Sequence, residues 1–182
     1  MMAAAENPSL LPFGGGGLIP AALRSKNRWA PWRAAWDVKR GKYDKIPVRA
    51  DHPELGISTA NPDRWFSFPV ALLAHQKAQG STAGLGYCMT RPHGIIGVDI
   101  DRSVVDGVVE PWAQEIINRL KSYTEISPSK RGLRIFVFGT IEDGDWANHG
   151  VGVEVYHGST PRFLTVTGKL VPGSPPDVCP PP

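Results

Sequence analysis

Long hydrophobic runs are missing from this chain of 182 residues, because no apolar stretch approaches the ~18–20 residues that cross a bilayer. Cysteine is scarce, and the two cysteines, Cys88 and Cys179, lie far apart with no paired spacing. A disulfide framework and a structural zinc cluster are therefore not expected. The N-terminal region lacks the basic stretch of a signal peptide, and Glu6 interrupts its apolar residues. We expect a protein of the cytoplasm.

A strong excess of charge of one sign is also absent, since the net charge is +3 and the pI about 9.0. This mild basicity permits nucleic-acid binding but does not demonstrate it, because many enzymes without such a partner are equally basic. The hydrophobic content of 41% is ordinary for a globular protein, and the length is close to that of one domain. A chain of this length buries a sizeable core.

Glycine and proline mark the expected domain limits. Residues 1–17 end in the glycines Gly14 to Gly17 and are expected to form a flexible N-terminal segment. Residues 171–182 are proline-rich and are expected to form an extended tail or linker. Residues 18–170 then form the folded domain. An ending of this kind suggests the front module of a longer protein, or a trimmed fragment of one.

Alternation and helical periodicity predict the secondary structure. Pro31 places a strand over 28–36 at a sheet edge or a bulge, and Ser67 caps a helix over 68–79. The segments 85–90 and 94–101 are predicted to form a hairpin. The other predicted elements are a short helix from Pro20, a helix start at Asn61–Pro62, a helix over 111–121, and strands near 43–49, 123–127, 132–139, 151–156 and 162–168. This order predicts an α/β or α+β fold with a mixed or antiparallel sheet.

Two aspartates, Asp99 and Asp101, alternate with Val98 and Ile100 in the segment GIIGVDIDR. Because successive strand residues point to opposite faces, both carboxylates are predicted to share one face while the apolar side chains face the core. Such a pair is suited to bind one or two Mg²⁺ or Mn²⁺ ions. Glu154, in a later strand with the same alternation, could complete the cluster. The alternative is that all three acids lie on solvated strand faces.

The turn SPSKRGLR carries hydroxyls, cations and a glycine at the start of a strand. Backbone N–H groups, hydroxyls and fixed charge in such a turn are suited to bind a phosphate chain. The GxxxxGK[ST] spacing of a Walker loop is absent, and an ordinary basic turn is the alternative. The candidate phosphate-binding residues of this turn and strand are Ser127, Ser129, Lys130 and Arg134.

The closing strand RFLTVTG places Thr165 and Thr167 on one face, although threonine is also simply a good strand residue. Arg162 is more suggestive, because it follows Glu154 by eight residues and could contact phosphates or pair with an acid.

Three tryptophans, Trp29, Trp32 and Trp36, fall in one N-terminal segment. Tryptophan rings stack on nucleic-acid bases, but filling the core is their commoner function. The five histidines show no metal-binding spacing and are expected in loops or on the surface, with some interest in His157 because it lies close to Glu154.

Taken in order, these segments resemble the prim-pol domain of phage and plasmid primase-polymerases, in the archaeo-eukaryotic primase superfamily. The likeness spans roughly residues 18–170 and rests on RWAPW, KIP, DRWFSF, VDIDR, SYTEISPS, GLRIFV, VEVY and RFLTVTG, in that order. It implies an α+β fold, with a primase-like catalytic core whose RRM-like mixed or antiparallel sheet is flanked by helices.

The resemblance also implies functional residues. The family's first motif matches Asp99 and Asp101 and its third matches Glu154, which makes these three acids the catalytic residues and the metal ligands. The second motif, a serine-x-histidine-like element that holds the nucleotide's phosphates, falls on the basic turn. Arg134 stands at its histidine position, so phosphate binding is retained and any role for a titrating imidazole is lost. The implied nucleotide-binding residues are Ser127, Ser129, Lys130, Arg134, Arg162, Thr165 and Thr167.

The implied function is DNA-templated nucleotidyl transfer in the replication of a phage, plasmid or other mobile element. Two Mg²⁺ or Mn²⁺ ions would activate the primer 3′-hydroxyl and neutralise the triphosphate. The implied partners are template DNA, a primer, dNTP or NTP substrates, and a helicase or helical priming module beyond the C-terminus, with no membrane. The implied location is the cytoplasm of a bacterium or of a phage-infected host. Because initiation can require that helical module, we predict primer extension rather than primer initiation.

Two other functions remain open. A non-catalytic nucleic-acid-binding module of a replication initiator would keep the same fold. The intact acids argue against this module, whereas Arg134 in place of histidine leaves it open. A metal-dependent nuclease ranks lower, because the acid-x-lysine partner is missing after Glu154, where the sequence runs VYHG.

Overall fold

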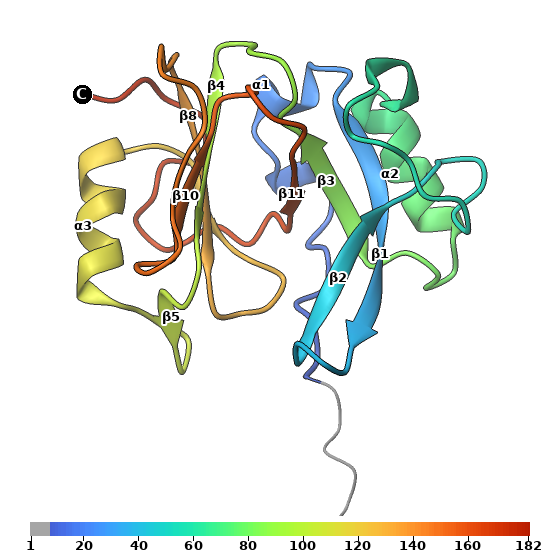
Figure 1. Cartoon of the computed structure of the whole chain (residues 1–182), viewed down its shortest axis with the longest axis horizontal. Coiled ribbons are helices and arrows are strands. Elements are labelled where there is room, and N and C mark those ends of the chain that lie inside the picture. Colours follow the sequence, from blue (N-terminus) through green and yellow to red (C-terminus); the bar gives the residue numbers. More distant parts are fainter. Residues whose placement is uncertain (1–7) are drawn as a thin grey trace, which may run out of the picture.

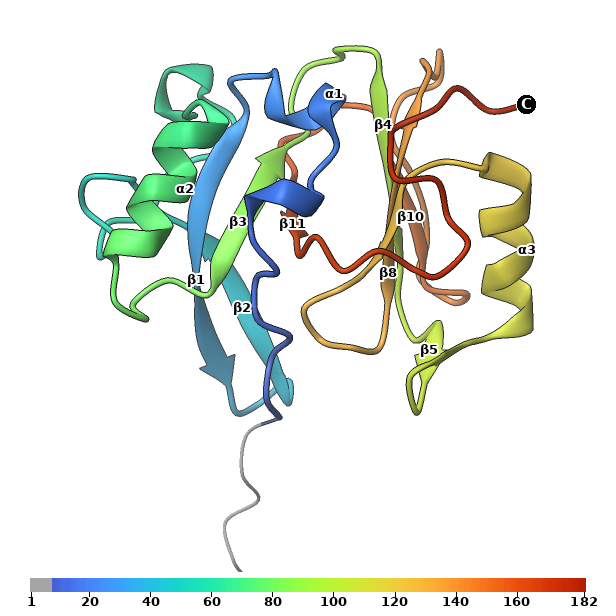
Figure 2. The same ribbon diagram turned by 180° about the vertical axis from the view of Figure 1, so that it is seen from behind.

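The computed structural model describes residues 8–182 and has an α+β fold in which the paired strands are antiparallel. Two sheets lie side by side (Figures 1 and 2). Helix α2 (Phe68–Lys77) covers the outer side of the first sheet, and helix α3 (Pro111–Leu120) covers the outer side of the second. The predicted α+β class and the helices predicted over 68–79 and 111–121 are therefore confirmed.

The first sheet has the strand order β11-β3-β1-β2. Its strands are β1 (Trp29–Asp37), β2 (Lys42–Pro47), β3 (Gly84–Cys88) and β11 (Phe163–Val166). Short helical turns precede and follow the β1–β2 hairpin along the chain: η1 (Gly16–Leu18), α1 (Ala21–Arg24) and η2 (Pro62–Arg64). Asn61 caps η2 as predicted, since its side chain accepts the Asp63 N–H at 3.0 Å.

The second sheet has the strand order β7-β8-β4-β10-β9, with β4 at its centre. Its strands are β4 (Ile95–Ile100), β7 (Thr124–Ile126), β8 (Leu133–Phe138), β9 (Trp146–Asn148) and β10 (Val153–Tyr156). A small hairpin of β5 (Val104–Val105) and β6 (Val108–Val109) links β4 to α3. The sequence did not reveal β5, β6 or β9, because two or three residues are too few to display alternation.

The two sheets meet across a continuous core. The ring of Tyr87 from β3 lies edge-on to the ring of Phe136 from β8, with centroids 6.0 Å apart. Leu164 from β11 fits against Gly97 of β4 so closely that a Cβ at position 97 would lie 2.4 Å from its Cδ1. Glycine at 97 therefore lets the sheets approach. A second cluster, which includes Ile117 of α3, fills the other side of the second sheet.

The predicted hairpin of 85–90 with 94–101 is wrong. Strand β3 pairs with β1 and β11 in the first sheet, whereas β4 pairs with β8 and β10 in the second. Both strands are central in their sheets, and each needs two partners for its backbone groups. The turn residues between them therefore mark a crossing from one sheet to the other.

Two smaller expectations also differ from the structure. Pro31 lies in an inner strand, where its missing N–H falls at the end of the β1–β2 pairing and the Val48 N–H still donates to its carbonyl at 2.9 Å. Ser67 precedes helix α2 as predicted, but its side chain makes no capping hydrogen bond.

The segments outside 18–170 make backbone contacts with the sheets where they are described. The amide of Gly14 donates to the Thr167 carbonyl at 2.8 Å. In the proline-rich tail, Val178 is 5% exposed, and the amide of Tyr123 donates to the Asp177 carbonyl at 3.1 Å. Residues 1–7 of the predicted flexible segment lie outside the described residues. Within residues 8–182, no helix has the length and hydrophobicity to span a bilayer.

Candidate active site on the second sheet

One row of residues across the second sheet is charged on four successive strands. The register pairs Glu125 of β7 with Arg134 of β8, Arg134 with Asp99 of β4, and Asp99 with Glu154 of β10. Directly opposed residues on neighbouring antiparallel strands point to the same face, with Cβ atoms ~4.5–5.5 Å apart. The row therefore brings three acids and one arginine together on one face.

The rows on either side of this charged row are apolar. Ile135, Val98 and Val155 form one neighbouring row, and Leu133, Ile100 and Val153 form the other. These side chains point to the opposite face and pack with α3 in the second core cluster. The alternation predicted for the strands of Asp99 and Glu154 is confirmed.

Arg134 is the buried centre of the row. Its side chain is 4% exposed, its Nη1 forms an ion pair with Oδ1 of Asp99, and the same Nη1 donates to the Leu133 carbonyl at 3.1 Å. Burial lowers the pKa of the guanidinium to about 10, and the neighbouring Tyr156 and Glu154 partly oppose that shift. Its Nε is buried and has no hydrogen-bond partner within the described part of the chain. Arg134 therefore has an unused donor beside an acid.

Glu154 holds the other end of the row. The Tyr156 hydroxyl donates to its Oε2, and the exposed His149 ring lies 3.0 Å from its Oε1. The Arg162 guanidinium lies over the Tyr156 ring, 5.3 Å from the centroid. Arg162 therefore contacts Tyr156, which in turn donates to Glu154. The histidine that contacts Glu154 is His149. His149 was not singled out because it comes from the turn before β10, where no alternation fixes its direction.

Asp101 lies just beyond the end of β4 and is exposed. Its amide donates to the Gly152 carbonyl at 2.8 Å, which continues the β4–β10 register by one more bond. Asp101 itself lies in a turn, but its carboxylate lies close enough to Lys45 for its charge to act on the Lys45 pKa, as the charge of Arg134 also does. Gly132 of the basic turn lies against Asp101, since a Cβ at position 132 would be 3.5 Å from the Asp101 Cα.

Lys45 of β2 brings a further cation to the site from the first sheet. It is half-buried, and it lies close enough to Arg134 and Asp101 for their charges to act on its pKa. Burial and the charge of Arg134 lower that pKa to about 7, while Asp101 opposes the shift. Sequence reasoning missed Lys45, because only the packing of two sheets brings position 45 close to position 134. In the sequence, the only indication of a role for Lys45 was that it belongs to the segment KIP.

The basic turn that precedes β8 is compact. The Ser127 and Ser129 hydroxyls lie 3.0 Å apart, and the Ser127 amide donates to the Gly132 carbonyl at 2.8 Å. Lys130 has a φ of 64°, a backbone conformation that favours glycine, and its Nζ donates to the Ser9 hydroxyl at 2.9 Å. In this structure, therefore, Lys130 contacts the N-terminal segment, while Ser127 lies in the buried base of the turn.

The two threonines of the closing segment differ in their contacts. The Thr167 hydroxyl donates to the Ile126 carbonyl at 2.7 Å and accepts the Lys169 N–H at 3.1 Å, so its capacity is used by the fold. The Thr165 hydroxyl is buried and lacks a partner within residues 8–182. Of the two, Thr165 has the free hydroxyl for a ligand.

Glu125 is a buried acid that sequence reasoning did not select. Its carboxylate accepts the Tyr123 hydroxyl at 2.7 Å and the amides of Thr167 and Gly168 at 2.9 Å each. Burial raises its pKa to about 7, and these three donors limit the shift. Glu125 thus fastens the end of the closing strand to the second sheet.

The predicted acids fit a divalent cation by their chemistry but not by their arrangement. Carboxylate oxygens are the ligands that Mg²⁺ and Mn²⁺ prefer, so the donor chemistry of Asp99, Asp101 and Glu154 fits such an ion. In the described range 8–182, no three His, Cys, Asp or Glu side chains are arranged to hold a metal ion. Asp99 pairs with Arg134 instead, and Glu154 with Tyr156. The metal ligands and the nucleotide-binding residues stay predictions.

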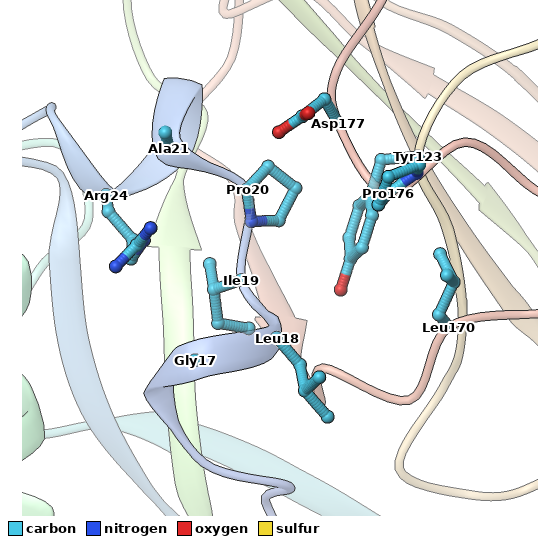
Figure 3. A pocket seen from close by; sticks show the side chains of 10 residues that line it. All are labelled: Gly17, Leu18, Ile19, Pro20, Ala21, Arg24, Tyr123, Leu170, Pro176 and Asp177. Carbon is cyan, nitrogen blue, oxygen red and sulfur yellow. The ribbon is translucent and has the colours of Figure 1, made fainter.

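A pocket of about 220 Å³ lies between the N-terminal turns and the C-terminal segment (Figure 3). Its lining includes Leu18, Pro20, Tyr123 and Asp177, and no predicted site residue. It therefore adds nothing to the candidate active site.

The chain is 30% identical over 163 residues to the DNA primase-polymerase of Nitratiruptor phage NrS-1, and the match covers 85% of this chain. The chain is related to the prim-pol proteins. It spans about a fifth of the length of that relative, 21%. No family model matches the chain.

Proposed function

We propose that this chain is the catalytic domain of a primase-polymerase, which adds nucleotides to a primer on a DNA template. The observation that carries the proposal is the charged row of the second sheet, in which Arg134, Asp99 and Glu154 lie on one face. Its relationship to a DNA primase-polymerase makes nucleotidyl transfer the chemistry that best suits this row. The proposal includes a primase-like catalytic core for the second sheet and its neighbours.

In this proposal, Asp99, Asp101 and Glu154 hold Mg²⁺ or Mn²⁺. Such ions, when bound, lower the pKa of a 3′-hydroxyl and neutralise a triphosphate. The position of Asp101 suits this role, because its exposed carboxylate is not part of any ion pair among residues 8–182. Asp99 and Glu154 are held in place by opposite strands of one ladder.

The triphosphate is bound between the two sheets. Arg134 approaches from the second sheet, with a planar fork of donors and an Nε that has no protein partner in the described residues. Lys45 approaches from the first sheet, and its charge is close enough to interact with Arg134 and Asp101. A phosphate chain between two cations relieves their mutual repulsion, which lowers the cost of holding both in a half-buried site. Arg162 and the free Thr165 hydroxyl add donors on the side of β11.

The substrates in this proposal are dNTPs or NTPs, a primer and a DNA template, in the replication of a phage, plasmid or other mobile element. Extension of an existing primer is the activity proposed for this chain. A helicase or a helical priming module remains a proposed partner.

A second function has one observation in its favour. Arg134 forms an ion pair with Asp99 where the family pattern has histidine, so the acid is already neutralised by the protein. A nucleic-acid-binding module of a replication initiator, with the fold but not the catalysis, would have such a site.

A primer-extension assay separates the two functions. The chain is incubated with a primed DNA template, dNTPs or NTPs, and Mg²⁺ or Mn²⁺, and compared with the Asp101→Asn variant. Incorporation that requires the cation and is lost in the variant supports the polymerase. Binding of the primed template without any incorporation, under every cation and nucleotide, overturns it in favour of the binding module.

A further inference from the structure

The three N-terminal tryptophans are divided by the fold. Trp29 is fully buried, Trp32 is 1% exposed, and both fill the interior. Trp36 is only half-buried, and its ring lies edge-on to Tyr43 with centroids 4.9 Å apart. Neither Trp36 nor Tyr43 belongs to the two core clusters. Filling the core therefore explains the first two tryptophans but not Trp36, whose contact is the cross-strand pair with Tyr43.

The aromatic pair lies where the first sheet narrows to two strands. Strand β3 pairs with β1 only from Trp29 to Trp32, whereas β2 pairs with β1 from Trp32 to Asp37. The outer half of the β1–β2 hairpin therefore projects past β3. In Figures 1 and 2 it does so at the end of the molecule where the β5–β6 hairpin and the turn before β8 also lie.

The pair shares a face with Lys45, the cation of the candidate site. The register sets Trp36 opposite Tyr43 and Ala34 opposite Lys45, and these four side chains point the same way. Tyr43 precedes Lys45 by two residues, which is ~7 Å along a strand. Since Lys45 interacts with the charges of Arg134 and Asp101, the aromatic pair is the next feature along the hairpin outside the site.

The charge around the pair is positive. Arg40 forms ion pairs with both Asp37 and Asp44, so the two acids of the hairpin share one cation. Residues 33–45 contain five lysines and arginines and only these two acids. Lys39 and Lys42 are exposed, and no ion pair within residues 8–182 includes either of them. Lys39 lies in the turn, and Lys42 is opposite Asp37 and therefore on the face away from the rings, so the two uncommitted ammonium groups flank the aromatic pair at the end of the hairpin.

We infer that the outer half of the β1–β2 hairpin, residues 33–45, is a docking surface for single-stranded nucleic acid. Bases stack on the Trp36–Tyr43 pair, and Lys39 and Lys42 contact phosphates. Stacking rings combined with free cations are the chemistry that binds single strands without sequence preference. The inference deepens the proposed function and rests on it in one respect. If the chain is a polymerase, the strand bound here is its template or its primer.

The test measures binding directly. A fluorescently labelled oligothymidylate is titrated with the full chain in EDTA, and fluorescence anisotropy reports the dissociation constant. Trp36→Ala and Tyr43→Ala are each expected to weaken binding about fivefold to 100-fold, because stacking contributes ~1–3 kcal/mol per base. Lys39→Gln with Lys42→Gln is expected to reduce the slope of log affinity against log salt by about 1.4, at ~0.7 per phosphate contact.

Trp146→Ala is the matched control. Trp146 is 53% exposed on β9, opposite Val155 and therefore on the face of the second sheet that points away from Glu154. Its removal is expected to leave binding unchanged. Trp36→Phe keeps a stacking ring and is expected to bind within a few-fold of the wild type, which separates stacking from misfolding.

The outcomes distinguish this inference from the proposed function. Wild-type affinity in Trp36→Ala and Tyr43→Ala overturns the docking surface, even where primer extension succeeds. Weakening by Trp146→Ala equal to that by Trp36→Ala overturns it as well. Loss of affinity in the two hairpin variants alone supports it, and does so even where the chain fails to extend any primer.

Discussion

The two ends of the charged row differ in how completely their charges are satisfied. At one end, the Glu125 carboxylate is fully buried and accepts three hydrogen bonds from groups that the fold holds in place. At the other end, Glu154 and Asp99 are partly exposed, and the side chains paired with them are a tyrosine, an exposed histidine and an arginine with an unused Nε.

This difference separates a structural acid from candidate functional acids within one row. A buried carboxylate with every oxygen bonded to the fold has nothing left for a ligand, and its removal leaves buried donors without partners. Partly exposed acids, one of which is paired with an exposed histidine, exchange their partners at lower cost. Alternation alone does not make this distinction, because Glu125 and Glu154 both occupy strand positions that face the same way.

The largest effect is expected at the exposed end. Asp101→Ala should reduce nucleotide incorporation to background, because it removes a carboxylate that no protein group replaces. Since Asp101 is exposed, the free energy of unfolding should change by no more than ~0.5 kcal/mol. Primer extension with Mg²⁺ and with Mn²⁺, together with urea denaturation, measures both quantities. Undiminished incorporation by a folded variant would remove Asp101 from the metal site.

Arg134→Ala should produce the next largest effect, this time on two properties. Triphosphate affinity should fall about tenfold to 100-fold, since a hydrogen bond to a charged group contributes ~1.5–3 kcal/mol. Stability should also fall, because Asp99 loses the partner of a largely buried ion pair. Arg134→Lys is the matched control, because it keeps the charge and loses the planar fork.

Nucleotide affinity of the Arg134 variants can be measured by isothermal titration with a triphosphate and Ca²⁺, which avoids turnover. A lysine variant that restores stability but not affinity would show that bidentate contact matters. Equal affinity in the alanine variant and the wild type would place the phosphates elsewhere.

The sequence predicted which strand residues share a face better than it predicted the route of the chain. Alternation in GIIGVDIDR and VEVY placed Asp99 and Glu154 on one face, because a strand's side-chain period is fixed by its backbone. The pairing of 85–90 with 94–101 failed, because a turn reverses the chain without stating which strands pair. Lys45 was missed for the same reason, since its neighbours depend on how two sheets pack. Local patterns carry no information on such long-range register.

Glu125→Ala should reduce stability more than it reduces activity. The amides of Thr167 and Gly168 would lose their acceptor, and each buried unsatisfied donor costs ~1–3 kcal/mol. The free energy of unfolding should therefore fall by about 2 kcal/mol or more, while incorporation per folded molecule should change far less than in Asp101→Ala. Urea denaturation and primer extension below the unfolding range measure the two effects. A variant that is stable but inactive would show that Glu125 is a functional acid rather than a structural one.

The smallest effect is a pH dependence of stability from the same residue. Burial raises the pKa of Glu125 from 4.5 to about 7, so between these values the folded chain keeps a proton that the unfolded chain has released. The contribution of Glu125 to the free energy of unfolding is therefore complete below pH 4.5, decreases as the pH rises through this window and is lost above about pH 7. Glu125→Gln has no such titration, so the difference in unfolding free energy between wild type and variant should decline across that window. Parallel pH profiles for the two proteins would show that the carboxyl does not bind a proton on folding, and the contrast between the two ends of the row would then rest on hydrogen bonding alone.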